Sequence, residues 1–344
     1  MKICIVTDAW HPQINGVVTT LTRTVATLCD WGHEVMTLTP DQFATLPCPT
    51  YPEIRLSLVG SPTIRRLLAD FKPDAVHIAT EGPLGWATRA ACRRLGLVFT
   101  TSYHTRFPEY LRMRVPVPLA LSYAVVRRFH RAAERTMAAP TIIDELAAKG
   151  FAPLKPWSRG VDTCLFRPRA DTAAKPPCPV FLTVGRVAPE KNLSAFLDLD
   201  LPGEKWVIGD GPALADLRRS YPQVRFFGAK RGEDLARHMA AADVFVFPSL
   251  TDTFGIVLLE ANACGVPVAA FPVTGPRYLV REGANGCLDT DLRAAILRAL
   301  SLSRTVCRET ASGYSWEACT RQFFGNLVRN HAAAPVGRTC AVRG

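Results

Sequence analysis

The sequence predicts an α/β protein built from two doubly wound, Rossmann-like domains that face each other across a central cleft. Three observations lead to this architecture. The chain has 344 residues, which is enough for two domains with a core each. Short β-branched runs alternate with helical patterns, as is typical of parallel strands joined by helices. A stretch rich in proline, residues 166–179, separates the two halves like a linker.

In chain order, the expected strands of the first half are residues 3–7, 34–39, 75–78, 98–101 and 141–143, and those of the second half are 180–184, 206–208, 224–227, 244–247 and 266–270. The proposed domains are therefore residues 1–165 and 180–313. Over residues 314–331, the spacing of Trp316, Thr320, Phe323 and Leu327 predicts an amphipathic helix that could cross back to the first domain, with Ser315 as its cap. The polar tail, residues 332–344, is expected to be disordered.

Composition indicates a folded protein that binds anions. Hydrophobic residues make up 48% and charged residues 21%, close to the globular average. The net charge is +11, and most of the basic residues are Arg, whose planar side chain binds phosphate through two hydrogen bonds.

Cysteine usage and hydropathy indicate a cytoplasmic location. The 11 cysteines are scattered and odd in number, without metal-site spacing, so we expect a reducing compartment and no structural metal. The start of the chain is too short and polar for a signal peptide, and the longest apolar stretch, residues 115–126, contains two prolines and is too short to span a membrane.

Glycines follow two of the expected strands. The loop at residues 7–17 places Asn15 and Gly16 before a helix, where free backbone N–H groups could meet an anion or a sugar, although an ordinary turn explains them equally well. Gly209 and Gly211 form a second turn that invites comparison with a dinucleotide-binding fingerprint. The fit is poor, because Leu214 stands where Gly or Ala is needed and no ribose-binding acid follows, so a nicotinamide dehydrogenase is disfavoured.

The loop at residues 185–192 carries two cations, Arg186 and Lys191, after the strand at 180–184 and next to Gly185. At the carboxyl edge of a parallel sheet, two such cations can straddle a diphosphate. The alternative is a solvated loop in which the arginine pairs with Glu190.

Residues 249–260 contain a polar turn and then an almost wholly apolar helix with a single carboxylate, Glu260. A buried carboxylate requires a partner, which could be ligand hydroxyls or an interior Arg. At the expected helix start, the N–H groups of Thr253, Phe254 and Gly255 could receive a phosphate or a sugar. Asp252 could instead serve as the N-cap.

His104 ends the strand near residue 103, at the expected cleft edge, where it could be catalytic, a hydrogen-bonding group or structural. The segment 89–135 mixes many Arg with large apolar residues, a composition suited to an anionic membrane surface. A solvated helix face or nucleic-acid binding would give the same composition, but no nucleic-acid motif accompanies it, so we expect no nucleic-acid partner. The basic residues assigned to this membrane or acceptor side are Arg106, Arg112, Arg114, Arg127 and Arg128.

Taken together and in this order, the segments 12–17, 158–162, 185–192, 209–212 and 252–260 resemble the retaining glycosyltransferases of family GT4, which have the GT-B fold and include bacterial α-mannosyltransferases and glycolipid-forming enzymes. The resemblance covers about residues 2–327. It implies a nucleotide-sugar donor held mainly by the second domain and an acceptor that approaches from the first.

The resemblance also implies roles for individual residues. Arg186 and Lys191 match the pair that neutralises the departing diphosphate, and fixed positive charge placed where negative charge develops is a large catalytic contribution. Glu260 matches the acid that holds the donor ribose. Asp252 matches the acid beside the transferred sugar, one methylene shorter than the family's usual Glu, and His104 matches a histidine near that sugar.

The expected catalytic set is therefore Arg186, Lys191, His104 and Asp252. The expected donor-binding set is Asn15, Gly16, Gly185, Gly209, Gly211, Thr253, Phe254, Gly255 and Glu260. Members of this fold generally need no bound metal, and we expect no cofactor. The D-x-D sequence at Asp289 and Asp291 precedes a helical pattern and indicates a turn and a cap.

The implied reaction is transfer of a hexosyl unit from a UDP- or GDP-sugar, with retained anomeric configuration, to an acceptor. A membrane lipid or lipid-linked saccharide is the preferred acceptor because of the basic, aromatic segment, and this implies a peripheral position on the inner face of the cell membrane. Two alternatives stay open: a nucleotide-sugar epimerase or phosphorylase with the same fold, and a non-catalytic nucleotide-sugar-binding protein. The sugar, the linkage and the oligomeric state do not follow from the sequence.

Overall fold

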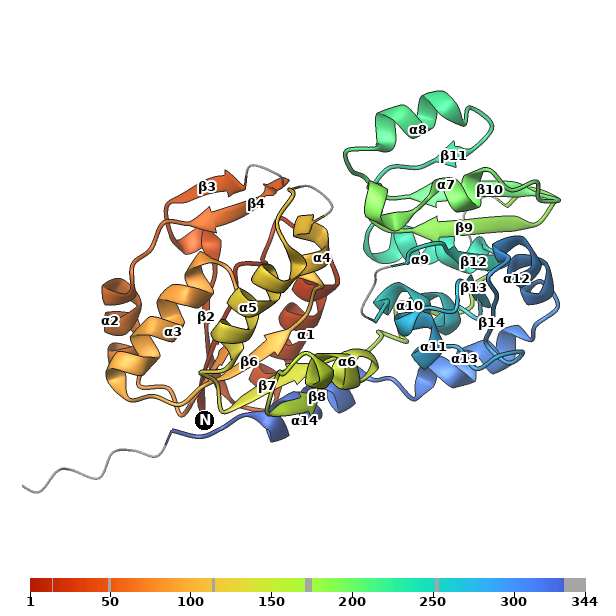
Figure 1. Cartoon of the computed structure of the whole chain (residues 1–344). Helices are drawn as coiled ribbons and strands as arrows, with labels where there is room; N and C mark the ends of the chain where they lie inside the picture. Colours follow the sequence, from red (N-terminus) through yellow and green to blue (C-terminus); the bar gives the residue numbers. More distant parts are fainter. Residues whose placement is uncertain (14, 49–50, 113–114, 171–174, 251–253, 331–344) are drawn as a thin grey trace, which may run out of the picture.

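The structure is a computed structural model that describes residues 1–330 except 14, 49–50, 113–114, 171–174 and 251–253. Two α/β units lie side by side (Figure 1), the first drawn from red to yellow-green and the second from green to blue. Each contains a six-stranded, all-parallel sheet. The predicted pair of doubly wound, Rossmann-like halves is confirmed.

The first sheet has the strand order β2-β1-β5-β6-β7-β8. Its strands are β1 (Lys2–Val6), β2 (Glu34–Leu38), β5 (Ala75–Ile78), β6 (Thr100–Tyr103), β7 (Arg135–Ala138) and β8 (Leu154–Pro156). The helices between them are α1 (Gly16–Asp30), α2 (Ser61–Phe71), α3 (Pro83–Leu95), α4 (Phe107–Arg112), α5 (Leu119–His130) and α6 (Ile143–Ala148). Two short 3₁₀ turns, η1 (Pro40–Gln42) and η2 (Pro140–Ile142), and an antiparallel hairpin of β3 (Thr45–Cys48) and β4 (Tyr51–Ser57) complete this half.

Both faces of the first sheet are buried, because successive side chains of a strand point to opposite faces. In β1, Ile3 and Ile5 pack in the same cluster as Leu21 of α1. The intervening Cys4 and Val6 pack with residues of α2 and α3 on the other face. This explains why the strand reads as a continuous apolar run.

The second sheet has the order β11-β10-β9-β12-β13-β14. Its strands are β9 (Val180–Val184), β10 (Glu204–Ile208), β11 (Arg225–Phe226), β12 (Val244–Phe247), β13 (Val268–Ala270) and β14 (Gly286–Leu288). Its helices are η3 (Pro189–Lys191), α7 (Ser194–Leu197), α8 (Leu214–Ser220), α9 (Gly232–Ala241), α10 (Ile256–Ala263), α11 (Thr274–Leu279), α12 (Leu292–Ala299) and α13 (Arg304–Ser312). Val244 and Val246 pack with α7 and α12, whereas Phe245 packs with α9 and α10.

The last helix, α14 (Trp316–Asn326), crosses back and packs against the first half, as expected (Figure 1). Ser315 caps it by accepting a hydrogen bond from Ala318 N. The two chain segments that join the halves touch each other. Val161 N donates to Tyr314 O at 2.9 Å, and a Cβ on Gly160 would lie 2.7 Å from Trp316 N, so glycine is required at this crossing.

The expected strand at residues 141–143 is wrong. These residues lie in η2 and at the start of α6, because Pro140 begins a helical turn there, and the strand of this region is β7. Strands β8 and β14 have three residues each and leave too short a pattern to recognise. Hairpin strand β3 contains Pro47, which argues against a strand from sequence alone.

Candidate active site

The two halves meet at the starts of two helices. Asn15 caps α1 through its side-chain oxygen, which accepts hydrogen bonds from Val17 N and Val18 N at 3.0 Å. A Cβ built on Gly16, the first residue of α1, would lie 3.3 Å from Cδ1 of Ile256, the first residue of α10. The glycine loop of the first half therefore lies against the helix that carries Glu260 in the second half.

The cationic loop follows β9 and is tied to the loop before α10. Arg186 lies 3.7 Å from the buried Glu190 carboxylate, a long ion pair that leaves the guanidinium partly exposed. Lys191 ends the 3₁₀ turn η3. The next residue, Asn192, donates from Nδ2 to Pro248 O at 3.1 Å. A Cβ on Gly185 would meet nothing within 4 Å, so the backbone there is open to a ligand.

Gly209 and Gly211 permit close packing of two loops. A Cβ on Gly209 would lie 1.8 Å from Gly185 O, and one on Gly211 would lie 2.3 Å from Val187 O. Both glycines also have positive φ. Their local structure explains them without a ligand, since they let one loop pack against the loop that carries Arg186, and a role in donor binding stays a prediction.

The loop between β12 and α10 differs from the expected helix start. Helix α10 begins at Ile256, and Gly255 is its N-cap with φ of +85°, so the helix starts later than the sequence pattern indicated. Phe254 is buried against the sheet. Asp252 and Thr253 lie outside the described residues, so their expected roles stay predictions.

Glu260 has no ion pair or hydrogen bond to its carboxylate in the described part of the chain, so the interior Arg partner considered from the sequence is not found there. Burial raises the pKa of this carboxyl to about 7. Since the desolvated group would gain from hydrogen-bond donors, it fits the hydroxyls of a bound ribose.

His104 lies in a buried polar network. Arg159 Nη2 donates to His104 Nδ1 at 2.9 Å, and His104 Nε2 lies 2.8 Å from Ser102 Oγ. Burial first, and then the Arg159 guanidinium, hold the pKa of His104 well below its usual value. The ring is thus neutral and held by both nitrogens, and contact with the donor sugar stays a prediction.

Arg159 belongs to the 158–162 motif but has no role in the sequence argument. Its guanidinium is buried and donates to Trp157 O and Ser158 O as well as to His104. Burial lowers the pKa of this group to about 10. The pairing with His104 spans 55 residues of sequence, so no local pattern could reveal it.

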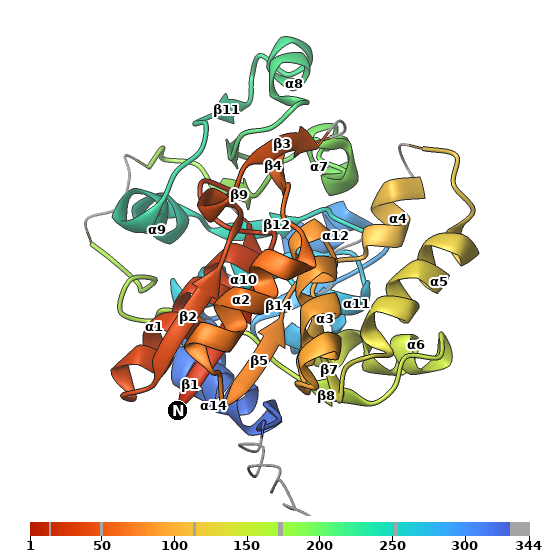
Figure 2. The same ribbon diagram turned by 90° about the vertical axis from the view of Figure 1, so that its left-hand side faces the viewer.

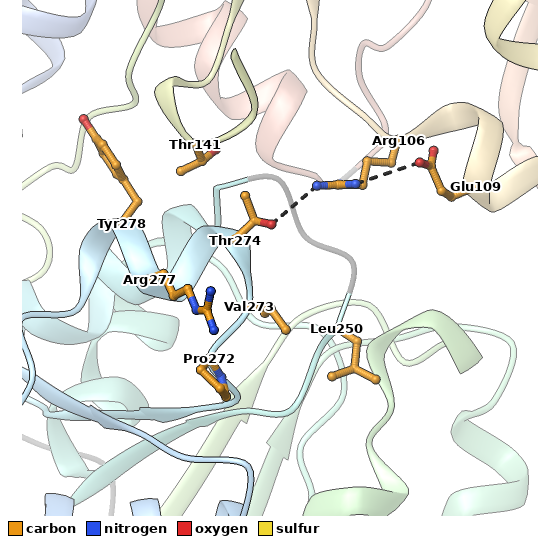
Figure 3. Close-up of a pocket in the computed structure, with 9 residues that line it drawn as sticks. All are labelled: Arg106, Glu109, Thr141, Leu250, Pro272, Val273, Thr274, Arg277 and Tyr278. Atoms are coloured by element: carbon orange, nitrogen blue, oxygen red, sulfur yellow. Dashed lines mark hydrogen bonds and ion pairs between the residues drawn. The ribbon is translucent and has the colours of Figure 1, made fainter. Parts of the chain in front are cut away.

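A pocket of about 580 Å³ lies between the halves (Figure 3). Arg106 enters it from the first half and Arg277 from α11 of the second. The sequence argument missed Arg277, Thr274 and Tyr278. A usable signal was present, because these residues follow the strand at 266–270 and therefore lie at its carboxyl edge.

The basic residues assigned to the membrane or acceptor side separate into two groups. Arg106 lines the pocket, where it forms a bidentate ion pair with Glu145. Arg112, Arg127 and Arg128 lie exposed on α4 and α5. Arg114 lies outside the described residues.

Metal ligands do not gather in the described ranges: no group of three or more His, Cys, Asp or Glu is placed to hold an ion there. Asp291 accepts hydrogen bonds from Arg293 N and Ala294 N and is the N-cap of α12, as expected. Asp289 pairs with Arg298. None of the described helices has the length and apolar character that spanning a bilayer requires.

Comparison with known proteins identifies the family. Residues 14–164 match the family described as "Glycosyltransferase Family 4", and residues 178–302 match "Glycosyl transferases group 1". The chain is 32% identical over 380 residues to a GDP-mannose-dependent alpha-mannosyltransferase of Mycolicibacterium smegmatis, with 98% of each chain covered. The chain is a family 4 glycosyltransferase. The predicted hexosyltransferase activity is thereby confirmed.

Two further proteins are similar to this glycosyltransferase, one in sequence and one in structure. It is 25% identical to the alpha-monoglucosyldiacylglycerol synthase of Streptococcus pneumoniae, over 94% of this chain and 83% of that protein. Its fold is similar to that of sucrose-phosphate synthase from Thermosynechococcus elongatus, with a TM-score of 0.75 and 20% identity over 94% and 97% of the two chains. The expected GT-B architecture is confirmed.

Proposed function

We propose that this glycosyltransferase transfers mannose from GDP-mannose, with retention of configuration, to an acceptor at a membrane surface. The observation that carries the proposal is the placement of Arg186 and Lys191 on a loop joined through Asn192 and Pro248 to the start of the Glu260 segment. A full-length relative is a GDP-mannose-dependent alpha-mannosyltransferase, which supports this donor.

The leaving group of such a reaction is a nucleoside diphosphate that gains negative charge as the glycosidic bond breaks. Arg186 forms a long ion pair with Glu190, and its partly exposed guanidinium could also bond a phosphate oxygen. Lys191 supplies the second charge. Cations fixed in place before the reaction stabilise the transition state without reorganisation, so this loop can perform the neutralisation that a metal performs elsewhere, and we propose that no metal is needed.

Glu260 anchors the nucleotide in this proposal. Its carboxylate would accept hydrogen bonds from the two ribose hydroxyls, replacing the partners that the described chain does not supply. The acceptor oxygen then bonds the anomeric carbon on the face from which the diphosphate leaves, and the hydroxyl proton passes to the departing phosphate oxygen. The configuration is thus retained without a covalent intermediate. Both alternatives considered from the sequence, an epimerase or phosphorylase and a non-catalytic binder, are less well supported than transfer.

The membrane surface is assigned to α4 and α5, which lie together on one side of the first half (Figure 2). Leu121 and Val125 are one helical turn apart and are 58% and 49% exposed, and Arg128 continues the same face. Phe107 at the start of α4 is 51% exposed, and Arg112 ends that helix. Exposed apolar side chains beside cations suit an anionic lipid interface. The lipid-modifying relative is consistent with this assignment.

The test is a product assay. Purified protein is incubated with labelled GDP-mannose, and in parallel with UDP-glucose, in the presence of vesicles of total bacterial lipid. The proposal predicts label in the lipid extract, with an α-linkage by NMR, and more product from GDP-mannose. Release of free sugar or nucleotide without glycosylated product, or a clear preference for the UDP-sugar, would contradict it.

A further inference from the structure

The pocket between the halves is separate from the donor machinery. Its walls come from the α4 region and η2 on one side and from α11 with the preceding loop on the other (Figure 3). The cationic loop that carries Arg186 and Lys191 does not line it, and neither does Glu260. The volume of about 580 Å³ is large enough to hold a saccharide group.

The pocket nevertheless adjoins the donor site. Leu250, three residues after the end of β12, lines it. The Tyr278 ring, 44% exposed in the pocket wall, packs against Phe254 with ring centroids 6.0 Å apart. Phe254 is two residues before α10, the helix that carries Glu260. A group bound in the pocket therefore lies next to the expected position of the transferred sugar.

On the first half, the charges at the pocket form a closed cluster. Arg106 makes two hydrogen bonds to the Glu145 carboxylate, at 2.9 and 2.6 Å, and lies 3.8 Å from Glu109. Lys149 also bonds Glu145 and lies 3.7 Å from Glu109. Tyr123 donates its hydroxyl hydrogen to Glu109. Partial burial would raise the pKa of Glu145, but the hydrogen bonds from Lys149 and Arg106 hold it below the usual value.

The formal charges of these four side chains cancel, since two cations face two carboxylates. Glu109, the acid in the pocket wall, has three partners at its Oε1 atom, whereas its Oε2 atom is buried without a hydrogen bond among the described residues. Arg106 also reaches across the gap to Thr274 Oγ1 at 3.5 Å. The first half thus offers the pocket a rigid wall without excess charge.

Arg277 provides the excess charge. It is exposed on the pocket side of α11, and among the residues that the structure describes its guanidinium has no hydrogen bond and no ion pair (Figure 3). Within that part of the chain, no other group competes with a ligand for its N–H donors. The Thr274 hydroxyl and the Tyr278 ring, one turn and one residue away, add a polar group and an apolar face of the kind that sugars bind.

We infer that this pocket is an acceptor subsite for a saccharide head group that carries one negative charge, a carboxylate or a phosphate, bound by Arg277. The inference rests on the proposed function, because Arg277 can orient an acceptor only if the protein is a transferase whose acceptor binds in this pocket. Arg277 fixes the orientation of the head group through its anion and so presents one hydroxyl to the donor sugar. It acts on specificity and not on the leaving group.

The test uses three soluble probes that differ only at carbon 6 of one hexose: octyl β-D-glucopyranoside, the corresponding glucuronide, and the 6-phosphate. Binding to the full chain saturated with GDP is measured by calorimetry, and KM and kcat with GDP-mannose are measured where transfer occurs. Both anionic probes should bind about tenfold more tightly than the neutral one, as expected for a charge-assisted hydrogen bond to a half-exposed group. Vesicles are absent, so membrane attraction does not contribute.

The variant Arg277→Gln should remove this preference by raising the Kd of the anionic probes to that of the neutral probe, with little change for the neutral probe. Arg65→Gln, which removes an exposed charge from α2, is the matched control and should keep the preference. Comparison of the two anionic probes decides between carboxylate and phosphate.

Equal binding of the three probes, or an anionic preference that survives Arg277→Gln, overturns the inference. So does the absence of binding by any probe to protein that binds GDP, and in that case the proposed donor chemistry stands. Failure to bind GDP or GDP-mannose contradicts the proposed function itself, and the inference falls with it.

Discussion

Gly16 and Ile256, the first residues of α1 and α10, meet across the gap between the halves: a Cβ on the glycine would lie only 3.3 Å from Ile256 Cδ1. Gly16 is exposed and does not require positive φ, so its role is to allow this approach. The contact brings the glycine loop of one half to the helix that carries Glu260 in the other.

A larger side chain at residue 16 should therefore impair catalysis more than folding. Gly16→Val should lower kcat/KM by about tenfold or more, because small displacements of bound reactants have large effects on rate. Gly16→Ala should have a smaller effect, since Ile256 can shift by a few tenths of an ångström. Steady-state kinetics and thermal unfolding check this. A loss of stability as large as the loss of activity would contradict it.

Stability should depend on pH through Glu260. Burial raises the pKa of this carboxyl from 4.5 to about 7, so the folded state binds its proton more tightly than the unfolded state does. The stabilising contribution is therefore complete below pH 4.5 and is lost as the pH rises to about 7. Relative to Glu260→Gln, the free energy of unfolding of the wild-type protein should fall by up to about 3 kcal/mol over this interval. Urea unfolding of both proteins at several pH values tests this, and parallel curves would refute it.

Binding of GDP should release protons below pH 7. The ribose hydroxyls donate hydrogen bonds to the ionised carboxylate, so a bound nucleotide lowers the pKa of Glu260. Calorimetric titrations at pH 6.5 in two buffers with different ionisation enthalpies measure the proton count. We expect greater release by the wild-type protein than by Glu260→Gln, because the GDP phosphate loses protons beside Arg186 and Lys191 in both proteins. Equal values for the two proteins would show that Glu260 does not meet the ribose.

The glycines after β10 should be intolerant of any side chain. Gly209→Ala and Gly211→Ala place a methyl group 1.8 and 2.3 Å from carbonyl oxygens, so each should destabilise the protein by about 3 kcal/mol or more. Gly325→Ala, in α14, whose Cβ would meet nothing within 4 Å, is the control and should not destabilise the protein. Denaturant midpoints give the comparison. A mild effect at residues 209 and 211 would mean that the two loops separate easily.

Membrane association should depend on the α5 face. Leu121→Asp should reduce flotation with anionic vesicles, because it removes an apolar contact and adds repulsion. Leu46→Asp is a matched control, since Leu46 is 55% exposed, similar to the 58% of Leu121, but lies on β3. Activity towards a soluble acceptor should not change in either variant. Equal flotation of the two variants would remove α5 from the membrane surface.

The sequence predicted the parts of the fold that depend on the local pattern of apolar residues. Buried parallel strands such as β9 and β12 are almost wholly apolar, and their predicted bounds were correct. The start of α10 was placed too early, because the positive φ of Gly255 is decided by packing and not by residue type alone. The strand β7 was misplaced because Pro140 was not recognised as a helix start.

The site was predictable where charge sits at a strand end and unpredictable where it depends on distant partners. Arg186 and Lys191 follow a strand, so their location at the sheet edge could be expected. The bond from Arg159 to His104 and the ion pair from Arg106 to Glu145 join segments 55 and 39 residues apart, and only the folded chain brings them together. For the same reason the sequence did not show that Arg106, assigned to the membrane or acceptor side, lines the pocket.

The most direct test of the account is the turnover of Arg186→Ala and Lys191→Ala with GDP-mannose. The control is Lys230→Ala, which removes a cation that lies just before α9 and pairs with Asp234 in that helix. Each of the first two should lower kcat by about a hundredfold or more, because each removes a charge that stabilises the departing diphosphate, while Lys230→Ala should stay near the wild-type value. Near-normal kcat in either Arg186→Ala or Lys191→Ala would contradict the central claim that these two side chains neutralise the leaving group.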